Sequence, residues 1–372
     1  PPQWDADFES RLRAADVVLV TNMGVGLDSP FLERLERWLY AHHPKYWIDV
    51  VEPKKTDILY RNLDEDKRVL LESYRRTSGV MNYVRLINGA FSTKPTSEWE
   101  EPDPIPWQAV MGREGNIYET YDEFMEAEGH RDWPSIAVYF YRDEWIMGDI
   151  EYQQALFEEI YKHQYNPIIF YGQYGSNPRV GIPNMKLSMN HLFGKDEFPF
   201  DVLINTCKFS FQSLGAQTLE ELKLQDVPIV QGYTIYMDEK SWTENPQGVT
   251  PLDVNLSISQ PELDGVIQGG VVACQTYDER GHYVYLPVKE RIAAIVQRAI
   301  KWSTLRHIPV SERKVAVILH NYPPKNSNIG SAAGLDTPES VLRLLRDMKA
   351  EGYTIDTVPE TSADLMLSLI HI

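Results

Sequence analysis

The chain alternates between short apolar runs rich in β-branched residues and longer stretches with helical periodicity. Alternation of this kind predicts βαβ units built on parallel sheets. Because the apolar runs are continuous, both faces of each sheet are expected to be covered. The expected strands span residues 15–23, 47–52, 135–141, 167–171, 200–207, 227–231 and 314–322, and the clearest helical periods cover 30–40, 151–163 and 338–349.

Breaks in this pattern divide the chain. Residues 1–104 are expected to form a first α/β unit, and the Pro-rich, acidic stretch 105–133 a linker or surface excursion. A second α/β unit is expected over 134–310, and 311–372 begins a third that is truncated. We therefore expect an α/β fold of several Rossmann-like parallel-sheet units joined by linkers, the last one incomplete. The chain starts without Met, which adds to the expectation that it is a portion of something longer.

Charge and composition narrow the possible partners. The sequence holds 54 acidic and 36 basic residues, a formal charge of −18, which argues against a nucleic-acid ligand. Its two cysteines form no Cys-x-x-Cys pair, as expected of a reduced, cytoplasmic compartment. No run approaches the ~18 apolar residues of a membrane span, and no secretory signal is readable. Proteins or small molecules are the expected partners.

Several common catalytic motifs are missing from the sequence. The glycines between Gly175 and Gly181 have the wrong spacing for a P-loop, so ATP hydrolysis is expected only in a partner. The run from Gly24 to Ser29 reads G-x-G-x-x-S and lacks the third glycine of dinucleotide sites. Neither a zinc-ligand spacing nor a nucleophile elbow is present. Generic NAD, zinc-enzyme and hydrolase functions are therefore disfavoured.

Two helix starts share a local pattern. Gly26 to Pro30 and Gly334 to Pro338 each follow an expected strand, with Ser29 or Thr337 as the expected N-cap and Pro at the first helical position. The shared requirements of a strand-to-helix turn explain the similarity of these two segments better than an internal duplication of the sequence does. Either way, both helix N-termini are able to hold an anion.

Three groups of polar and aromatic residues follow expected strands, where open α/β sheets bind ligands. The segment after strand 135–141 could hold a flat acidic ligand or could be a salt-bridged helix start. The segment after 200–207 adds a lysine beside aromatics that core packing explains well. The histidine that ends strand 314–322 has a structural, hydrogen-bonded role as its alternative. The candidate residues are Arg142, Trp145, Asp149, Lys208, His320, Asn321 and Tyr322.

These motifs carry a resemblance to a known family. Arg313 to Tyr353, with its N-Y-P turn, Gly loop and G-L-D-T-P helix start, is similar to the large subunit of ATP-dependent tetrapyrrole metal chelatases, the CobN and magnesium chelatase H-subunit family. Phe140 to Asp149 resembles a family segment R-S-H-W-x-x-G-D, departing at Asp143 and Glu144. Segments 226–233, 241–265 and 290–306 extend the match, so it covers nearly everything after Pro106.

The resemblance implies a function for a longer protein. The chain would be an N-terminal portion of a ligase-class chelatase subunit, and this portion alone is expected to be inactive. The large subunit binds the tetrapyrrole, while an AAA+ ATPase and a second small chelatase subunit use ATP. The substrates would be a divalent metal and a tetrapyrrole: cobalt with hydrogenobyrinic acid a,c-diamide in one branch, or magnesium with protoporphyrin IX in the other. The N-Y-P and W-x-x-G-D segments look closer to the cobalt branch.

Metal insertion would require a base for the pyrrole protons and transient His or carboxylate metal ligands. His320 is the best local candidate, although the base and ligands are as readily expected in a part that this chain lacks. An acidic chain repels an anionic macrocycle, so binding should depend on local donors. Arg142, Lys208 and the helix start at Thr337 are the expected anchors, and Trp145 and Tyr322 the stacking surfaces. The alternative is a non-catalytic α/β scaffold that docks the motor subunits.

Overall fold

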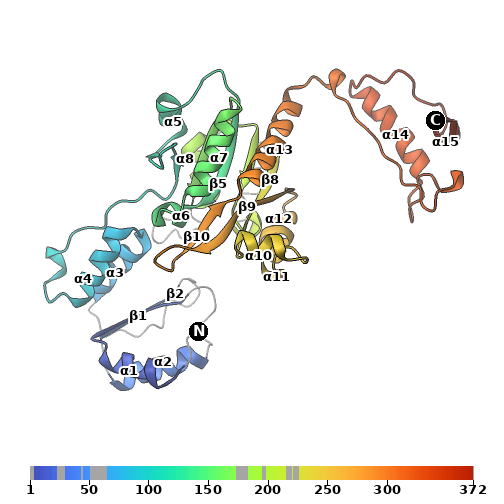
Figure 1. Cartoon of the computed structure of the whole chain (residues 1–372). Coiled ribbons are helices and arrows are strands. Elements are labelled where there is room, and N and C mark those ends of the chain that lie inside the picture. Colours follow the sequence, from blue (N-terminus) through green and yellow to red (C-terminus); the bar gives the residue numbers. More distant parts are fainter. Residues whose placement is uncertain are drawn as a thin grey trace. The chain divides into compact units, whose positions relative to one another are not determined.

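The protein forms two compact units. The computed structural model describes residues 4–22, 30–42, 45–50, 65–172, 183–194, 198–214, 220 and 226–371 (Figure 1). Unit 1 comprises residues Pro1–Trp107 and Arg142–Asp149, and unit 2 comprises Gln108–Tyr141 and Ile150–Ile372. The chain therefore leaves unit 2 at the end of one strand, contributes a short helix to unit 1, and returns.

Unit 1 contains a small parallel sheet with two helices. Strands β1 (Val17–Asn22) and β2 (Lys45–Val50) pair in parallel, and α1 (Ala6–Ala14) and α2 (Pro30–His42) flank them in the chain. The strands expected over 15–23 and 47–52 and the helix expected over 30–40 are thus confirmed within the described residues. The first of the two similar helix starts includes residues 26–29, which lie outside the described residues. The buried cluster of this part consists of Leu12, Val18, Leu35, Trp38 and Leu39.

A helical pair completes unit 1. Helices α3 (Glu65–Thr77) and α4 (Val80–Phe91) pack through a small buried cluster of Leu71, Tyr74 and Leu86. Gly79 joins them with a φ of +89°, a conformation that favours glycine. A 3₁₀ turn at Thr96–Glu98 and helix α6 (Arg142–Met147) are the remaining helical elements described in this unit.

Unit 2 is built on an eight-stranded sheet with the order β10-β9-β8-β7-β5-β6-β3-β4. Strands β5 to β9 run parallel, and the pairings of β10, β3 and β4 are antiparallel. The strands are β3 (Ala109–Met111), β4 (Ile117–Tyr118), β5 (Ser135–Tyr141), β6 (Asn166–Gly172), β7 (Val202–Asn205), β8 (Ile229–Ile235), β9 (Ile267–Tyr277) and β10 (Tyr283–Pro287).

The central strands β6 and β7 are buried along their whole length, as their continuous apolar sequences predict. The strands expected over 135–141, 167–171, 200–207 and 227–231 correspond to β5, β6, β7 and β8. The sequence did not predict the outer strands β3, β4, β9 and β10. The stretch 105–133, expected to be a linker or surface excursion, contains β3, β4 and α5 (Tyr121–Ala127), and β3 pairs with β6.

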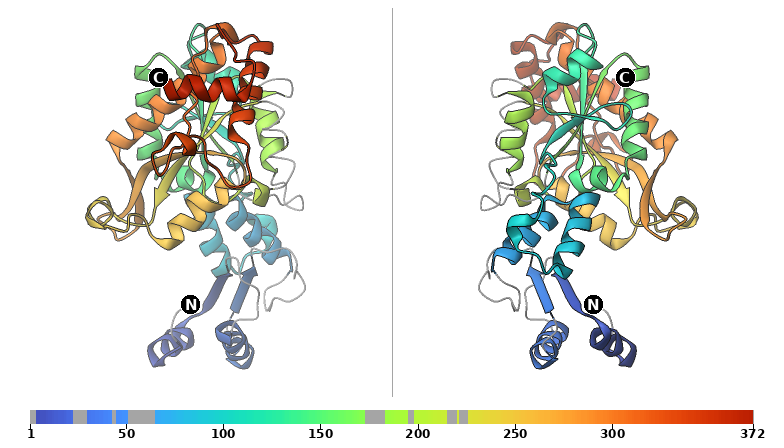
Figure 2. Two further views of the ribbon diagram at one scale, coloured as in Figure 1. Left: turned by 90° about the vertical axis from the view of Figure 1, so that its right-hand side faces the viewer. Right: turned by 90° about the vertical axis from the view of Figure 1, so that its left-hand side faces the viewer.

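Helices cover both faces of this sheet. Helices α7 (Glu151–Lys162) and α13 (Lys289–His307) pack on each other and on one face, while α8 (Met185–Phe193) lies on the other (Figure 2). After β8 come α10 (Glu239–Glu244), α11 (Pro251–Asp253), a π-helical turn at Val254–Ser259 and α12 (Gln260–Glu262). Among the described residues, no helix combines the length and the apolar character that a membrane crossing requires.

The pairing of β8 and β9 is irregular. The pairing of β8 with β9 shifts register near Gln231 and again near Tyr233. A Cβ atom added at Gly269 would lie 2.2 Å from the main-chain oxygen of Gln231. Glycine at 269 therefore permits this approach of the two backbones.

The C-terminal part differs from the sequence expectation. The strand expected over 314–322 does not form: residues 313–320 have no regular structure, and Ile318 is 92% exposed. A strand needs backbone partners, and in the described part of the chain the only bridge here joins Asn321 to Ile329. Short 3₁₀ turns occur at Val310–Glu312 and Asn326–Asn328.

Helix α14 (Thr337–Ala350) forms where 338–349 predicts it and contacts α15 (Ser362–His371). Its N-cap is Asp336 rather than the expected Thr337, because the Asp336 carboxylate accepts the Glu339 N–H at 3.1 Å. Helical geometry thus begins one residue earlier than the sequence predicted, with Thr337 inside the first turn.

Candidate functional site at the carboxyl edge of the large sheet

The loop that follows β7 lies at the carboxyl edge of the parallel strands. Asn205, the last residue of β7, pairs with Tyr139 of β5 and Gln231 of β8, and these two strands continue to Tyr141 and Ile235. Ligands of open α/β sheets bind outside this edge. Lys208, one of the expected anchors, is the third residue beyond β7. The side chains around it therefore constitute the candidate site.

A buried amide network fixes the beginning of this loop. Asn205 donates from Nδ2 to Oε1 of Gln231 at 2.8 Å and accepts the Cys207 N–H at 3.2 Å. Gln231 in turn donates to the Cys207 carbonyl at 2.9 Å. All three residues are at most 2% exposed. Buried amides satisfied in this way specify one backbone conformation.

Tyr141, the last residue of β5, holds the next peptide groups. Its hydroxyl accepts the Lys208 N–H at 2.7 Å and donates to the Lys208 carbonyl at 3.0 Å. Phe209 adopts a φ of +70°, which is uncommon for a bulky residue, and its N–H donates to the Leu256 carbonyl at 2.8 Å. The surrounding hydrogen bonds thus hold a strained backbone, a feature that clusters at functional sites.

The loop ends on a carboxylate. Asp264 accepts the Ser210 hydroxyl at 2.6 Å and the Phe211 N–H through its other oxygen. Phe211 itself is buried, at 2% exposed, and contacts Tyr139 at a ring distance of 6.5 Å. The segment from Cys207 to Phe211 is therefore fixed at both ends and in the middle.

The side chain of Lys208 is almost fully buried, with 6% of the residue exposed. Its ammonium donates to the Tyr285 hydroxyl at 2.9 Å and lies 3.7 Å from the centroid of the Tyr236 ring. The Tyr285 ring is 5.1 Å from the same nitrogen. Both aromatic contacts are within the range of cation–π attraction, which strengthens when the cation is desolvated.

Tyr236 is positioned by a buried acid. Its N–H donates to Asp253 at 3.1 Å, and Asp253, which is 0% exposed, also accepts the Thr250 hydroxyl at 2.6 Å. The Tyr236 side chain remains 40% exposed. Burial, and secondarily the nearby Asp253 charge, raises the pKa of the Tyr236 phenol. The hydroxyl therefore stays protonated near neutral pH and can donate a hydrogen bond.

The site offers no preformed metal centre. Among the residues that the structure describes, no three His, Cys, Asp or Glu side chains lie close enough together to hold a metal ion. Cys274 on β9 is 2% exposed, and burial raises its pKa to about 12. A thiol of that kind stays protonated near neutral pH, so it is a poor metal ligand or nucleophile.

Three of the expected ligand-binding residues belong to unit 1. Arg142 is 2% exposed; its Nε donates to the Pro106 carbonyl at 2.8 Å and its Nη2 to the Thr77 carbonyl at 2.8 Å. Its guanidinium also lies 4.4 Å from the Trp107 ring centroid. Trp145 and Asp149 are partly buried. Arg142 thus ties segments of unit 1 together, and contact of these residues with a ligand stays a prediction.

The residues expected at the end of strand 314–322 lie in the irregular C-terminal stretch. His320, Asn321 and Tyr322 are all exposed, Tyr322 at 73%. The His320 carbonyl accepts the Gly330 N–H at 2.7 Å, and the His320 and Tyr322 rings are 6.3 Å apart. Thr337 is half-buried in the first turn of α14. Their roles in binding and catalysis also stay predictions.

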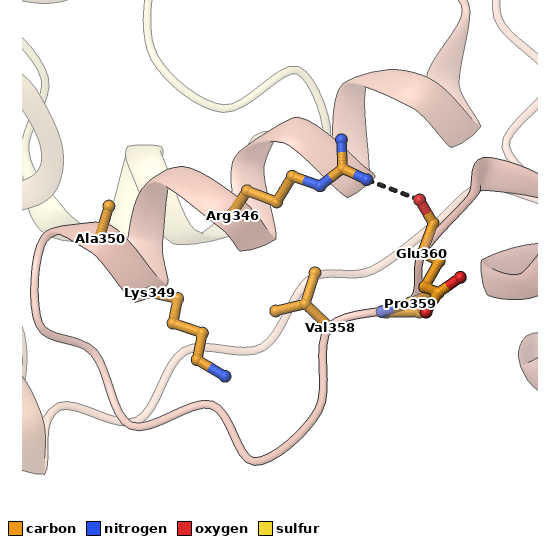
Figure 3. Close-up of a pocket in the computed structure, with 6 residues that line it drawn as sticks. All are labelled: Arg346, Lys349, Ala350, Val358, Pro359 and Glu360. Carbon is orange, nitrogen blue, oxygen red and sulfur yellow. Dashed lines mark hydrogen bonds between the residues drawn. The ribbon is translucent and has the colours of Figure 1, made fainter.

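Hollows in the described part of the chain are lined by other residues. One of about 270 Å³ lies beside α4 in unit 1 and is lined in part by Tyr74, Arg85 and Trp99. Another, of about 510 Å³, lies beside α14, where Arg346 donates to the Glu360 carbonyl at 2.6 Å and Lys349 and Val358 complete the wall (Figure 3). Neither hollow includes a residue that the sequence singled out.

Sequence reasoning found Lys208 but not its tyrosine neighbours. Tyr141 is the last residue of β5, Tyr236 directly follows β8, and Tyr285 lies on β10. The position of Tyr141 and Tyr236 at strand ends was a usable signal. For Tyr285 none was available, because β10 is an antiparallel edge strand that was not predicted.

Comparison with known proteins decides the family. A family model described as CobN/Magnesium Chelatase matches residues 72–372. The chain belongs to the CobN/magnesium chelatase family. The match covers the whole carboxyl-edge loop as well as the C-terminal stretch, and it confirms the resemblance that the motifs predicted.

The CobN/magnesium chelatase relatives are considerably longer than this chain. An uncharacterized protein of Methanocaldococcus jannaschii is 30% identical over 330 residues, 84% of this chain and 26% of its own length. The aerobic cobaltochelatase subunit CobN of Pseudomonas aeruginosa is 26% identical over 281 residues, 73% of this chain and 22% of its own. The chain thus spans about a quarter of the length of these relatives.

A solved structure supports the α/β fold class. The catalytic subunit of cobaltochelatase from Mycobacterium tuberculosis superposes with a TM-score of 0.60 at 22% identity, covering 100% of this chain and 30% of that one. The family member described here therefore shares the fold of that subunit over its length, with a large, mostly parallel sheet as its main element.

Proposed function

We propose that the chain is a portion of the large, tetrapyrrole-binding subunit of a metal chelatase. The observation that carries the proposal is the preorganised lysine at the carboxyl edge of the sheet. Lys208 is 6% exposed beside two tyrosine rings, in a segment that the family model covers. A cation next to aromatic faces suits a flat ligand with acidic side chains.

Cobalt is the favoured metal substrate, with hydrogenobyrinic acid a,c-diamide or a similar corrinoid precursor as the ring. In support, the Pseudomonas aeruginosa CobN aligns with 73% of this chain, whereas a magnesium-chelatase relative from Rhodobacter capsulatus aligns with 40%. Magnesium insertion into protoporphyrin IX is the second candidate, since the latter relative is 30% identical over 162 residues. An AAA+ ATPase and a second small subunit would use ATP in the cytoplasm.

In this proposal each predicted residue has a role. Lys208 anchors the macrocycle, Arg142 holds the segment that carries Trp145 and Asp149, and Tyr322 supplies a stacking surface. Insertion removes two pyrrole protons, and His320, being exposed, could accept one or ligate the incoming metal. Asn321 and the first turn of α14 at Thr337 would provide further polar contacts.

An absorbance titration of the chain with hydrogenobyrinic acid a,c-diamide and with protoporphyrin IX tests the proposal. We expect saturable binding, tighter for the corrinoid, that Lys208→Met weakens and that Lys301→Met, an exposed control on α13, leaves unchanged. Tyr322→Ala reports separately on the C-terminal stretch. No binding of either macrocycle would refute the proposal, and tighter binding of protoporphyrin IX would favour the magnesium branch.

A scaffold function is the competing proposal, and the formal charge of −18 supports it because an acidic surface suits a partner with a basic face. Pull-down of the AAA+ subunit in the absence of tetrapyrrole tests it. Capture without any macrocycle binding would favour the scaffold, and macrocycle binding without capture would exclude it.

A further inference from the structure

The hollow beside α14 is bounded by the last turns of that helix and by the segment that leads into α15. Its volume of about 510 Å³ is within the range of small-molecule sites. Figure 3 shows the side chains of Arg346 and Lys349 on α14, and those of Val358 and Pro359 on the facing segment. The hollow therefore combines two cations with an apolar wall. Its lining residues are Arg346, Lys349, Ala350, Val358, Pro359 and Glu360.

The two cations form no ion pair with the residues that the structure describes. Helical spacing pairs Arg343 with Glu339 at 3.1 Å, whereas leucine and alanine stand four residues before and after Arg346. Arg346 donates from Nη2 to the Glu360 carbonyl at 2.6 Å, and this acceptor carries no net charge. Because Arg346 and Lys349 are three residues apart on one helix, their like charges are neighbours and repel each other. An anion between them would remove that repulsion.

The end of α14 is compatible with a bound anion, although the free carbonyls of a helix C-terminus would repel one. The Met348 carbonyl accepts the Tyr353 N–H at 3.0 Å. The Lys349 carbonyl accepts the Gly352 N–H at 3.2 Å. Gly352 has a φ of +93°, the left-handed conformation in which a glycine ends a helix. These hydrogen bonds offset part of the negative end of the helix dipole, and they reverse the chain so that Val358 lines the hollow.

The facing wall is fixed by the start of α15. The Asp364 carboxylate accepts the Thr361 hydroxyl at 2.7 Å, and that hydroxyl accepts the Asp364 N–H at 3.1 Å. The bond from Arg346 joins the preceding residue, Glu360, to α14. The other N–H groups of Arg346 make no further described hydrogen bond. The guanidinium is thus oriented before a ligand arrives, so binding costs less conformational entropy at this position.

We infer that this hollow binds one edge of a flat tetrapyrrole that carries two ionised carboxylates. Arg346 pairs with one carboxylate, because a planar guanidinium presents parallel N–H groups to its two oxygens, and Lys349 pairs with the other. Val358 and Pro359 contact the apolar carbon frame between the two acids. The inference rests on the proposed function and deepens it, because it names residues for the acid side chains of the macrocycle that no sequence motif singled out.

The charge of the lining determines which ligands the hollow favours. Two cations and one carboxylate, that of Glu360, give it a net charge of +1. The whole chain has a formal charge of −18 and repels anions at long range, so an acid ligand requires such a local excess of positive charge. An ester of the same ring has no charge and makes no ion pair with either cation. The Glu360 carboxylate opposes an acid, so its neutralisation should strengthen binding.

Absorbance titrations of the full chain compare protoporphyrin IX with its dimethyl ester, which has the same ring and no ionised side chain. The free acid should have a dissociation constant roughly 5- to 20-fold lower at low salt, because two exposed ion pairs contribute modestly. The double change Arg346→Met and Lys349→Met should weaken binding of the acid and leave that of the ester unchanged. Glu360→Gln should strengthen binding of the acid alone, about two- to threefold. Added salt should reduce the preference for the acid.

Arg343→Met is the matched control, since Arg343 lies on the same helix, is paired with Glu339 and does not line the hollow. It should leave both dissociation constants unchanged, and circular dichroism checks that each variant is folded. Equal affinity of the parent chain for acid and ester, or an unchanged affinity for the acid in the double variant, overturns the subsite while macrocycle binding stands. Equal losses for both ligands in the double variant also overturn it, because they indicate a structural effect. Absence of all binding refutes the proposed function, and the subsite with it.

Discussion

Two regions of unit 2 carry predicted ligand-binding residues, and they differ sharply in organisation. In the Lys208 loop, residues 207–211, side chains from three strands hold the backbone, and Lys208 is 6% exposed. In the open stretch, residues 313–336, the described contacts are mostly local turns, and Tyr322 is 73% exposed. Yet the open stretch contains more than half of the longest segment that resembles the family, Arg313 to Tyr353.

The difference shows that motif strength and local order are separate properties. The open stretch is recognisable because its turn residues, such as the prolines after Tyr322 and the glycines before α14, are local in sequence. The Lys208 loop has no such signature, since Tyr141 and Gln231 reach it from other strands. Tertiary contacts can therefore order a loop whose own sequence signal is weak. Five measurements test this contrast.

Thiol labelling should show the largest effect. Cys274, on the strand beside β8, is 2% exposed with a pKa of about 12, whereas a cysteine introduced by Val317→Cys in the open stretch would be accessible. The thiolate fraction near pH 8 should then differ by about a thousandfold. Iodoacetamide labelling followed by peptide mass spectrometry measures both rates in one sample. Similar labelling rates would mean that the sheet opens readily around β9.

The same thiol predicts a pH dependence of stability. Its folded pKa lies above the unfolded value near 9, so the folded state retains the proton longer. The contribution of Cys274 to stability is then complete below about pH 9 and is lost as the pH rises toward 12. Urea denaturation between pH 8 and 11, with Cys274→Ala as the comparison, would detect it; identical pH profiles would contradict the assignment.

Substitution of a buried amide should have the next largest effect. Asn205→Leu leaves Oε1 of Gln231 and the N–H of Cys207 without the hydrogen bonds that Asn205 makes to them, and should cost about 3 kcal/mol of unfolding free energy. The matched change Asn321→Leu, at an exposed asparagine of the open stretch, should alter stability by less than ~0.5 kcal/mol. Urea denaturation measures the unfolding free energy of both variants. Equal losses would show that the two regions do not differ in local order.

Removal of one hydroxyl should have a moderate effect. Tyr141→Phe removes the group that bonds both sides of the Lys208 peptide, and should cost about 1–3 kcal/mol. Tyr322→Phe serves as the control, because its side chain is 73% exposed. Thermal unfolding followed by circular dichroism provides the measurement. A negligible cost for Tyr141→Phe would show that the loop is fixed by other contacts.

The smallest expected effect concerns the start of α14. Asp336→Ala should cost about 1 kcal/mol, because its carboxylate caps the helix by accepting the Glu339 N–H. Thr337→Ala should cost less, as Thr337 lies inside the first turn. The helicity and the unfolding free energy of the two variants show which residue is the N-cap. A larger loss of stability from Thr337→Ala would support Thr337, the N-cap predicted from the sequence.

The sequence predicted the elements whose signal is local. Strand β5 is an uninterrupted apolar run, and α7 and α14 have clear helical periods, so their ranges agree closely with expectation. Strand β9 was not predicted because it contains Gly269 and Gly270 and ends in polar residues. The run at 314–320 has strand propensity, but propensity alone cannot supply a partner for its backbone.

The candidate site was predictable only in part, for the same reason. Lys208 could be singled out because it closely follows a predicted strand. Its neighbours Tyr236 and Tyr285 depend on the order of the sheet, in which β8 and β10 flank β9. The contacts of Arg142 were equally unpredictable, since its guanidinium donates to carbonyls of residues that are far away in the sequence. The partners of side chains that are buried by tertiary contacts cannot be predicted from a single sequence.

Gly269 links strand β9 to the Lys208 loop. An added methyl group there would press against the Gln231 carbonyl, 2.2 Å away, and push β9 from β8. Gln231 is the residue whose side chain supports Cys207, immediately before Lys208. A methyl group on a strand that does not itself carry the lysine would thus shift the position of the ammonium. The position of Lys208 therefore depends on a residue of another strand that makes no direct contact with the loop through a side chain of its own.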